Sequence, residues 1–398
     1  MPTSIVPPGF PPADRIASFK PYFFAALGKK LADLRAKGMD IIRIDIGSPD
    51  LPPADFIIDA LEKSARRPDS HGYTPNGGSV AYREAISQYY KKRFNVDLDA
   101  TKEVIGLIGS KEGLFNLSQV LLNPGDVALV PDPGYPVYTG GTTIAGGELV
   151  TFPILRKNNF LPDLEAIPQD VLKRAKILWL NYPNNPTGAI APMEFLKSAV
   201  EFARKHNILL AHDAPYADVC FDHYHAPSIL EVDGAKDVVI EFNSLSKTYN
   251  MAGWRLGMAV GNAQVIKYLY TYKSQMDTST FGPIMDAGIA ALSGDQTWLE
   301  ERNVIYQERR DIVVQGLRDA GFTVDVPKAA IYVWAPLPHG FTDSMDFCNR
   351  LLEETGVSTT PGKVYGENGE GFLRISLGTE SGKMREAMRR IVEWMKRK

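Results

Sequence analysis

The feature that most restricts the fold is a series of short apolar runs, most of which stop at a polar turn and are followed by a helical pattern. Runs of this length, rich in Val, Ile and Leu, are typical of buried strands. Strands that alternate with helices form a mainly parallel sheet covered by helices, so the sequence predicts an α/β fold. In such sheets ligands bind beyond the carboxyl ends of the strands. The runs are 104–108, 126–130, 176–180, 208–211, 238–240 and 256–260.

Length and charge narrow the classes of protein that the chain can belong to. At 398 residues it exceeds one average domain, and we expect a large α/β domain over 46–299. The remainder, 1–45 together with 300–398, is expected to form a smaller α+β domain with an N-terminal arm. A net charge of −3 gives no basic excess, which argues against nucleic acid or a membrane surface as partner.

The cysteines, the N-terminal residues and the lengths of the apolar runs together indicate the cellular compartment. Cys220 and Cys348 lie far apart and form no C-x-x-C motif, so a disulfide framework is not expected. The proline-rich residues 1–14 contain no apolar stretch of the kind found in secretory signals. No run of apolar residues is long enough for a transmembrane helix. We therefore expect a cytoplasmic protein.

Outside the repeated units, two regions are expected to pack together as the smaller domain. A helix over 20–37 and a strand over 41–46 are predicted near the N-terminus. A separate helix over 80–93 is predicted within the large domain. The C-terminal third has its own pattern of helices and strands. Its predicted elements are a long charged helix over 298–318, strands at 331–334 and 372–376, a helix over 344–354 and a final amphipathic helix.

A lysine after one of the strands is the centre of the predicted chemistry. Lys247 follows the run 238–240, with Ser244 and Ser246 before it and Arg255 after it. The amine can form a Schiff base with an aldehyde while the hydroxyls and the guanidinium hold an anion. Pyridoxal 5′-phosphate (PLP) supplies both groups. On its own, a lysine in a serine-rich loop is more often a surface residue.

A second turn has the features of a phosphate site. Ser110 and Lys111 lie between a predicted strand and a predicted helix. Free backbone N–H groups at a helix N-terminus favour an anion such as phosphate. Taken alone, this turn is more often an ordinary loop between a strand and a helix. With Ser244, Ser246 and Arg255, it would complete a phosphate cradle.

The remaining parts of a PLP site also have candidates in these turns. Asp213 can pair with the ring nitrogen, and Tyr216 and Asn185 can hydrogen-bond the phenolic oxygen of the ring. Tyr135 can stack on the ring, although a core aromatic is an equal alternative. Arg374, on a late strand, is suited to a substrate α-carboxylate because its planar fork matches two carboxylate oxygens.

These segments resemble the class I, fold-type I aminotransferases over nearly the whole chain. The resemblance implies a mainly parallel seven-stranded sheet, PLP as cofactor and transfer of an amino group between an amino acid and a 2-oxo acid by a ping-pong mechanism. It also implies that Tyr73 reaches the phosphate of a neighbouring subunit, in a homodimer with shared active sites. The matching residues are 47–50, Tyr73, Gly77, Gly78, 110–112, Tyr135, 185–188, Asp213, Tyr216, Ser244, Ser246, Lys247, Arg255 and Arg374.

A closer resemblance is to the LL-diaminopimelate aminotransferases, which serve lysine biosynthesis with glutamate and 2-oxoglutarate as the other substrate pair. It implies that Tyr22 and Gly47 contact substrate. Segments 273–280 and 362–366 differ from that pattern, so an aspartate, alanine or aromatic aminotransferase is the alternative. The segments that carry the resemblance are 21–24, 212–216, 221–228, 244–257, 331–336, 360–362 and 369–376.

Motifs of other enzyme classes are missing from the sequence. There is no G-x-G-x-x-G after a strand, no G-x-x-x-x-G-K-[ST] and no G-x-S-x-G, which argues against dinucleotide oxidoreductases, kinases and serine hydrolases. His223 and His225 have no further ligands near them in sequence. We interpret them as loop residues and expect no metal.

Overall fold

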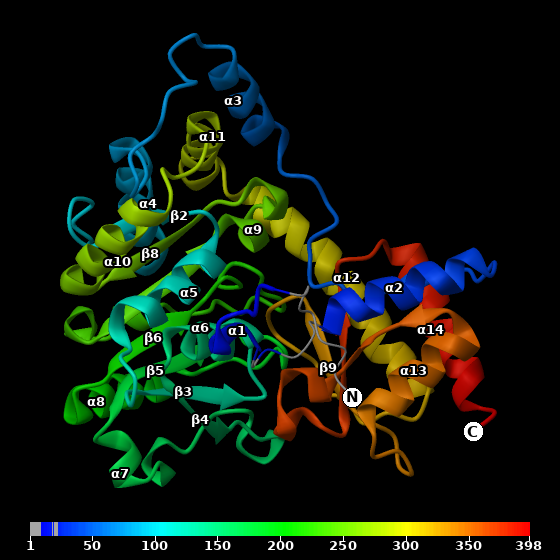
Figure 1. Cartoon of the computed structure of the whole chain (residues 1–398). Coiled ribbons are helices and arrows are strands. Elements are labelled where there is room, and N and C mark those ends of the chain that lie inside the picture. Colours follow the sequence, from blue (N-terminus) through cyan, green and yellow to red (C-terminus); the bar gives the residue numbers. More distant parts are fainter. Residues whose placement is uncertain (1–8, 18, 20–22) are drawn as a thin grey trace.

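The computed structural model describes residues 9–17, 19 and 23–398, and its largest element is a seven-stranded sheet. The strand order is β2-β8-β7-β6-β5-β3-β4 (Figure 1). Neighbouring strands from β7 to β4 are parallel, whereas β8 is antiparallel to both β2 and β7. The mainly parallel α/β fold is confirmed. The strands are β2 (Val104–Leu107), β3 (Val127–Asp132), β4 (Glu148–Pro153), β5 (Ala175–Asn181), β6 (Leu209–Asp213), β7 (Val239–Ser244) and β8 (Gly257–Gly261).

The central strands are apolar on both faces because helices cover both. In β5, Leu178 and Leu180 belong to one core cluster, whereas Ile177 and Trp179 belong to the other. Alternate side chains of a strand point to opposite faces, so each cluster marks one face of the sheet. Helices α4, α8 and α11 contribute to the first cluster, and α5, α6 and α10 to the second.

The helices around this sheet include several that the sequence pattern did not predict, among them α3, α6, α10 and α11. None of the helices in the described part of the chain is long and apolar enough to cross a lipid bilayer. The helices are α3 (Asp55–Ala65), α4 (Val80–Phe94), α5 (Ser110–Leu121), α6 (Pro136–Ala145), α7 (Gln169–Leu172), α8 (Met193–His206), α9 (Leu245–Thr248), α10 (Ala263–Met276) and α11 (Gly282–Ser293).

Two strands of the sheet, β4 and β8, depart from the predicted alternation of buried parallel strands and helices. Strand β4 was not predicted because it is an edge strand in which only Phe152 is buried, so it lacks a continuous apolar run. Strand β8 runs antiparallel because the link from β7 contains only the short helix α9 and a 3₁₀ turn. A parallel return needs a longer crossover, usually through a full helix.

The second part of the fold joins the two ends of the chain. Strands β11, β12 and β9 form an antiparallel sheet, and β1 pairs with β10. The predicted strand 41–46 is shorter than expected, but Ile42 and Ile44 are buried in the core of this part. Its elements are α1 (Asp14–Ala17), α2 (Phe23–Ala36), β1 (Ile42–Arg43), α12 (Thr297–Asp319), β9 (Tyr332–Pro336), α13 (Ser344–Thr355), β10 (Val357–Ser358), β11 (Thr360–Pro361), β12 (Phe372–Ser376) and α14 (Ser381–Met395).

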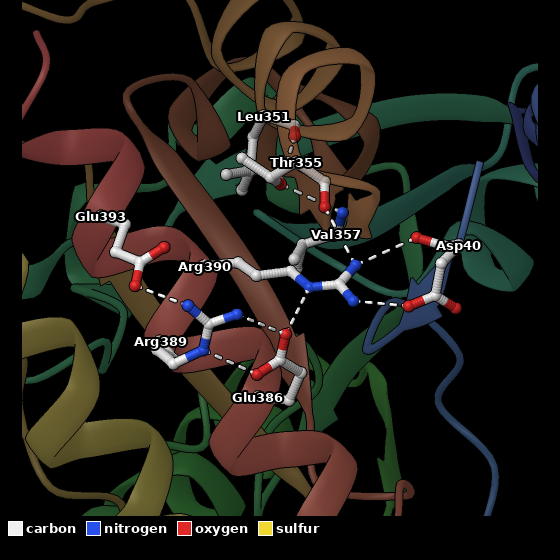
Figure 2. Close-up of polar contacts among 8 residues, drawn as sticks. All are labelled: Asp40, Leu351, Thr355, Val357, Glu386, Arg389, Arg390 and Glu393. Carbon is white, nitrogen blue, oxygen red and sulfur yellow. Dashed lines mark hydrogen bonds and ion pairs between the residues drawn. The ribbon is translucent and has the colours of Figure 1, made fainter.

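A single arginine of α14 links three segments of this part, as Figure 2 shows. The Arg390 guanidinium donates to the backbone carbonyl oxygens of Asp40 (3.0 Å) and Thr355 (3.1 Å). It also pairs with the Asp40 carboxylate at 2.5 Å and with Glu386 at 2.8 Å. Arg390 therefore fixes the entry to β1 against the C-terminal helices.

Candidate active site

A cavity of about 430 Å³ lies at the carboxyl ends of β5, β6 and β7, where the strand pattern predicted a ligand site. Its wall comes from both parts of the fold. One expected residue, Tyr73, does not line it. Tyr73 is 94% exposed, and Tyr22 lies outside the described residues. The predicted residues that line the cavity are Gly47, Ser110, Lys111, Tyr135, Asn185, Asp213, Tyr216, Ser244, Ser246, Lys247, Arg255 and Arg374.

Lys247 is placed by the short helix α9 directly after β7. Its Nζ donates a hydrogen bond to the backbone carbonyl of Gly47, which comes from the N-terminal segment. Burial lowers the pKa of Lys247 to about 7, with further contributions from the positive charges of Arg374 and Arg255. The amine is therefore substantially neutral near pH 7, the form that acts as a nucleophile or a base.

Asp213 is the last residue of β6, and only one of its two carboxylate oxygens accepts a hydrogen bond from a described residue. Oδ2 accepts a hydrogen bond from the Tyr138 hydroxyl at 2.7 Å. Oδ1 is buried and has no hydrogen-bond partner among the residues that the structure describes. Burial raises the pKa of Asp213 to about 6, against the opposing effects of Tyr138 and His212. A buried acceptor without a partner fits a cationic N–H group supplied by a ligand.

The turn before α5 is shaped around the Arg255 guanidinium. Gly109 has a φ of +73°, and a Cβ at this position would lie 2.3 Å from Arg255 Nη2. Arg255 donates to the Ala252 carbonyl at 2.9 Å and to Ser246 Oγ at 3.4 Å. The Ser244 hydroxyl accepts from the Ser246 N–H at 3.2 Å. A helix N-terminus, two hydroxyls and a guanidinium thus meet in one part of the cavity, which suits a phosphate.

Segment 273–280, which departs from the expected pattern, lies behind this turn and not in the cavity. The Lys273 ammonium is 1% exposed and pairs with Asp277 at 2.8 Å and with Glu112 at 3.3 Å. Glu112 in turn accepts from the Ile108 N–H at 2.9 Å. This departure therefore supports the helix that carries Ser110 and Lys111 without contacting the cavity.

Arg374 lies on β12 between two aromatic rings. Its guanidinium carbon is 4.2 Å from the centre of the Tyr332 ring and 4.9 Å from that of Tyr365. Nη1 donates to Asn185 Oδ1 at 2.9 Å, and Nη2 donates to the Asp45 carbonyl at 2.9 Å. These contacts hold the planar group in a fixed orientation, as required for bidentate binding of a carboxylate.

Several residues of the site were not predicted from the sequence. The Tyr332 hydroxyl lies 2.7 Å from that of Tyr216, and Tyr138 stacks on Trp179 while it donates to Asp213. Tyr365 and Arg43 also line the cavity. Arg43, Tyr138 and Tyr332 lie within or beside apolar runs, where their residue types do not indicate a site. Tyr365 belongs to segment 362–366, which was expected to influence substrate choice. The departing segment 362–366 thus contributes Tyr365, whereas Lys363 pairs with Glu367 instead.

Comparison with known sequences identifies the family. The family model for aminotransferase class I and II matches residues 39–391. An LL-diaminopimelate aminotransferase from Moorella thermoacetica is 49% identical over 379 residues, which cover 95% of this chain and 97% of the relative. One from Dehalococcoides mccartyi is 51% identical over 363 residues, which cover 91% and 93%.

Solved structures agree with this match. Substrate-bound BacF from Bacillus subtilis superposes with a TM-score of 0.93 at 39% identity and covers 97% of this chain and 98% of its own. A single mutant of the Thermus thermophilus aspartate aminotransferase gives a TM-score of 0.90 at 29% identity, with 96% and 99% covered. The family-model match spans both parts of the fold and all the cavity-lining residues except Phe24. The chain belongs to the class I and II aminotransferases.

Proposed function

We propose that this transaminase uses PLP to transfer an amino group between LL-diaminopimelate and 2-oxoglutarate, in the cytoplasm, on a route to lysine. One observation carries the chemistry, namely that Lys247, Asp213 and Arg374 line a single buried cavity. The choice of substrate is supported by the names of relatives that are 49% and 51% identical over more than nine-tenths of this chain.

The residues present fit PLP. The unpartnered Asp213 Oδ1 would bind the protonated ring nitrogen, and Tyr135 would cover the ring. Tyr216 and Asn185 would hydrogen-bond the phenolic oxygen. The phosphate would be held by Ser110, Lys111, Ser244, Ser246 and Arg255, which share one end of the cavity. When bound, PLP supplies an aldehyde that accepts the amino group and a ring that withdraws electrons from the substrate Cα.

The chain's own residues then supply binding and proton transfer. Arg374, fixed by Asn185 and the Asp45 carbonyl, binds the α-carboxylate of the amino acid. Lys247 is the residue that would bind the aldehyde of PLP. Its neutral Nζ then accepts the Cα proton and returns it, and the pKa of about 7 suits both steps near neutral pH. The second oxo acid uses the same residues in reverse, which gives ping-pong kinetics.

A coupled assay tests the substrate assignment. Purified enzyme is offered LL-diaminopimelate, aspartate, alanine and tyrosine, each with 2-oxoglutarate, and kcat/KM is measured for each. We expect the highest value for LL-diaminopimelate. A clear preference for any of the other three would overturn the substrate while the family stands.

Replacing the lysine tests the chemistry. Lys247→Ala should abolish turnover and the visible absorbance that the wild-type holoenzyme shows, because no amine remains to bind the aldehyde. The melting temperature of the variant should stay close to that of cofactor-free wild type, since within the described residues the Lys247 side chain makes one hydrogen bond, to Gly47. Retained turnover with a normal spectrum would contradict the assignment.

We also propose a homodimer in which Tyr73 enters the partner's site. The supporting observation is that Tyr73 is 94% exposed, outside the cavity of its own chain. Nearby, Thr74 donates to the Thr280 carbonyl at 2.8 Å, so the loop that carries Tyr73 is held against the α10–α11 link. A large aromatic side chain held on the surface in this way is suited to contact with another subunit.

A further inference from the structure

The proposed substrates carry a second carboxylate at the end away from the reacting carbon, and none of the residues assigned above binds it. We propose that Arg43 binds this far carboxylate and so selects dicarboxylic over monocarboxylic substrates. The inference rests on the proposed function and sharpens it. Arg43 lines the same cavity as Lys247 and Arg374.

Arg43 ends β1, two residues before Asp45, whose backbone carbonyl contacts Arg374. Ile42 and Ile44 point into the core, so Arg43 and Asp45 point to the opposite side. The Asp45 carbonyl accepts a hydrogen bond from Arg374 Nη2 at 2.9 Å. Since an extended chain advances by about 3.3 Å per residue, the Arg43 backbone lies about 7 Å beyond that of Asp45. The Arg43 side chain turns from this backbone toward the Asp45 carboxylate, so the far carboxylate would bind beside that ion pair.

The Arg43 guanidinium is held in place with donors to spare. Nε donates to Asp45 Oδ1 at 3.1 Å and Nη2 donates to Oδ2 at 2.6 Å. Asp45 is fully buried, whereas the Arg43 side chain is 29% exposed. A guanidinium has five N–H donors, and the described residues accept no further hydrogen bond from this one. The remaining donors can bind a carboxylate as a charge-assisted fork.

The wall of the cavity near Arg43 is partly apolar, as a chain of methylene groups requires. Phe24 and Ile46 line the cavity together with Arg43, and Ile46 is 41% exposed. Burying methylene groups against such side chains is favourable. The cavity therefore presents the Arg374 cation, an apolar wall and the Arg43–Asp45 ion pair, whose remaining N–H donors can bind the second carboxylate of a dicarboxylic substrate.

Glutamate and glutamine differ only in the far carboxylate, so the half-reaction with each amino acid tests the proposal. In single-turnover measurements on the PLP-loaded enzyme, Arg43→Gln should lower kcat/KM for glutamate by about 10- to 100-fold, as expected for losing a charge-assisted hydrogen-bonded pair. For glutamine we expect a change of less than about threefold. Glutarate, as a competitive inhibitor, should lose affinity by the same factor as glutamate loses kcat/KM.

Two variants separate recognition from a structural role of the ion pair. Arg156→Gln removes an arginine from an ion pair with Asp325 at 2.7 Å, away from the cavity. This variant should leave kcat/KM unchanged for both glutamate and glutamine. Arg43→Lys keeps the charge but not the fork, and should cause an intermediate loss for glutamate and glutarate. It also serves as the test if Arg43→Gln does not fold.

Equal losses for glutamate and glutamine, or no loss for glutamate and glutarate, would overturn the role of Arg43. A wild-type enzyme that transfers amino groups but prefers neither glutamate nor LL-diaminopimelate would instead overturn the proposed function. The two failures are therefore distinguishable.

Discussion

At the scale of single residues, two opposite pKa shifts prepare the cavity for its chemistry. Burial lowers the pKa of Lys247 to about 7 and raises that of Asp213 to about 6. Both shifts disfavour the charged form, as expected where water is excluded. Near pH 7 the amine is then partly neutral and the carboxylate is still mostly ionised. The cavity thus contains a usable base and an anion at the same pH.

The lowered pKa of Lys247 predicts how cofactor loading depends on pH. Only the neutral amine attacks an aldehyde, so the rate of PLP binding to cofactor-free enzyme should rise with pH through about 7 and then level off. Stopped-flow absorbance between acidic and alkaline pH would measure this rate. Nα-acetyllysine, as a control amine, should continue to gain reactivity above pH 9 because its pKa is unshifted, about 10.4.

A second variant checks the cause of that shift. In Arg374→Met, a nearby positive charge that lowers the pKa of Lys247 is removed. The midpoint of the loading profile should then move to higher pH. An unchanged midpoint in this variant, or a wild-type midpoint near that of the control amine, would contradict the electrostatic explanation.

Tyr332 is expected to act as a positioning residue for two others. Its hydroxyl lies 2.7 Å from that of Tyr216 and its ring packs on Arg374. Tyr332→Phe keeps the ring and removes the hydroxyl, so kcat should fall by about 3- to 10-fold, as for one hydrogen bond, while KM for the amino donor stays nearly constant. Tyr332→Leu also removes the ring and should raise KM. The same change in both variants would contradict this division of roles.

At the scale of elements, the site depends on contacts between segments that are far apart in sequence. The turn before α5 surrounds the Arg255 guanidinium, and Lys247 bonds to the Gly47 carbonyl. Segment 40–47 is itself held by α14 through Arg390. A shift of this segment would also move the Gly47 carbonyl that accepts the hydrogen bond from Lys247, because the same backbone runs along the cavity.

Arg390 and its neighbour Arg389 form a matched pair for testing this support. Arg390→Met removes hydrogen bonds to two backbone carbonyls and an ion pair with Asp40 (Figure 2). We expect a cost of about 1–2 kcal/mol and a melting temperature about 1–3 °C lower. Calorimetry on the purified variants would measure the shift.

Arg389→Met serves as the control on the same helix. Among the residues that the structure describes, Arg389 pairs with Glu386 and Glu393 on its own helix, and exposed pairs of this kind contribute little. Its melting temperature should match that of the wild type. Equal destabilisation by the two variants would show that Arg390 has no special role in joining the segments.

At the scale of the whole molecule, the cavity lies where two sheets meet. We propose that the domains are 46–299 and 1–45 with 300–398, since Ile42 and Ile44 pack in the core of the C-terminal part. The first domain contributes Lys247 and Asp213, and the second contributes Arg374 and Tyr332. In the proposed arrangement one domain would hold the cofactor while the other would bind the substrate.

The proposed homodimer with shared sites predicts complementation between two inactive or weakened chains. Tyr73→Ala should weaken PLP binding, because the partner's phosphate loses a hydroxyl, and Lys247→Ala should be inactive. A heterodimer of the two contains one site with Lys247 from one chain and Tyr73 from the other. Mixing the unfolded chains and refolding them should therefore yield more activity than the sum of the separately refolded variants.

Size-exclusion chromatography of the mixture, with a different tag on each variant, provides the control. Tagged heterodimers with no gain in activity would contradict the exchange of Tyr73. A wild-type chain that remains monomeric at assay concentration while fully active would contradict the dimer as well.

The sequence by itself determined the α/β class and most of the residues that line the cavity, because strand ends and turn residues are local signals. Lys247, Asp213, Ser110 and Arg255 could be identified since each follows a recognisable apolar run or turn. In a parallel sheet the carboxyl ends of neighbouring strands share one edge, so their convergence followed from the fold class. The edge strand β4 gave no such signal, because it is largely exposed.

Only the tertiary structure decided which side chains from distant segments complete the cavity. Arg43, Tyr138 and Tyr332 look like strand or core residues in sequence, and their roles depend on partners as remote as Asp213 and Arg374. The pKa shifts of Lys247 and Asp213 are likewise products of burial, which no local pattern encodes. Chemistry that depends on residue type could be predicted from the turns, whereas orientation and electrostatics required the packed molecule.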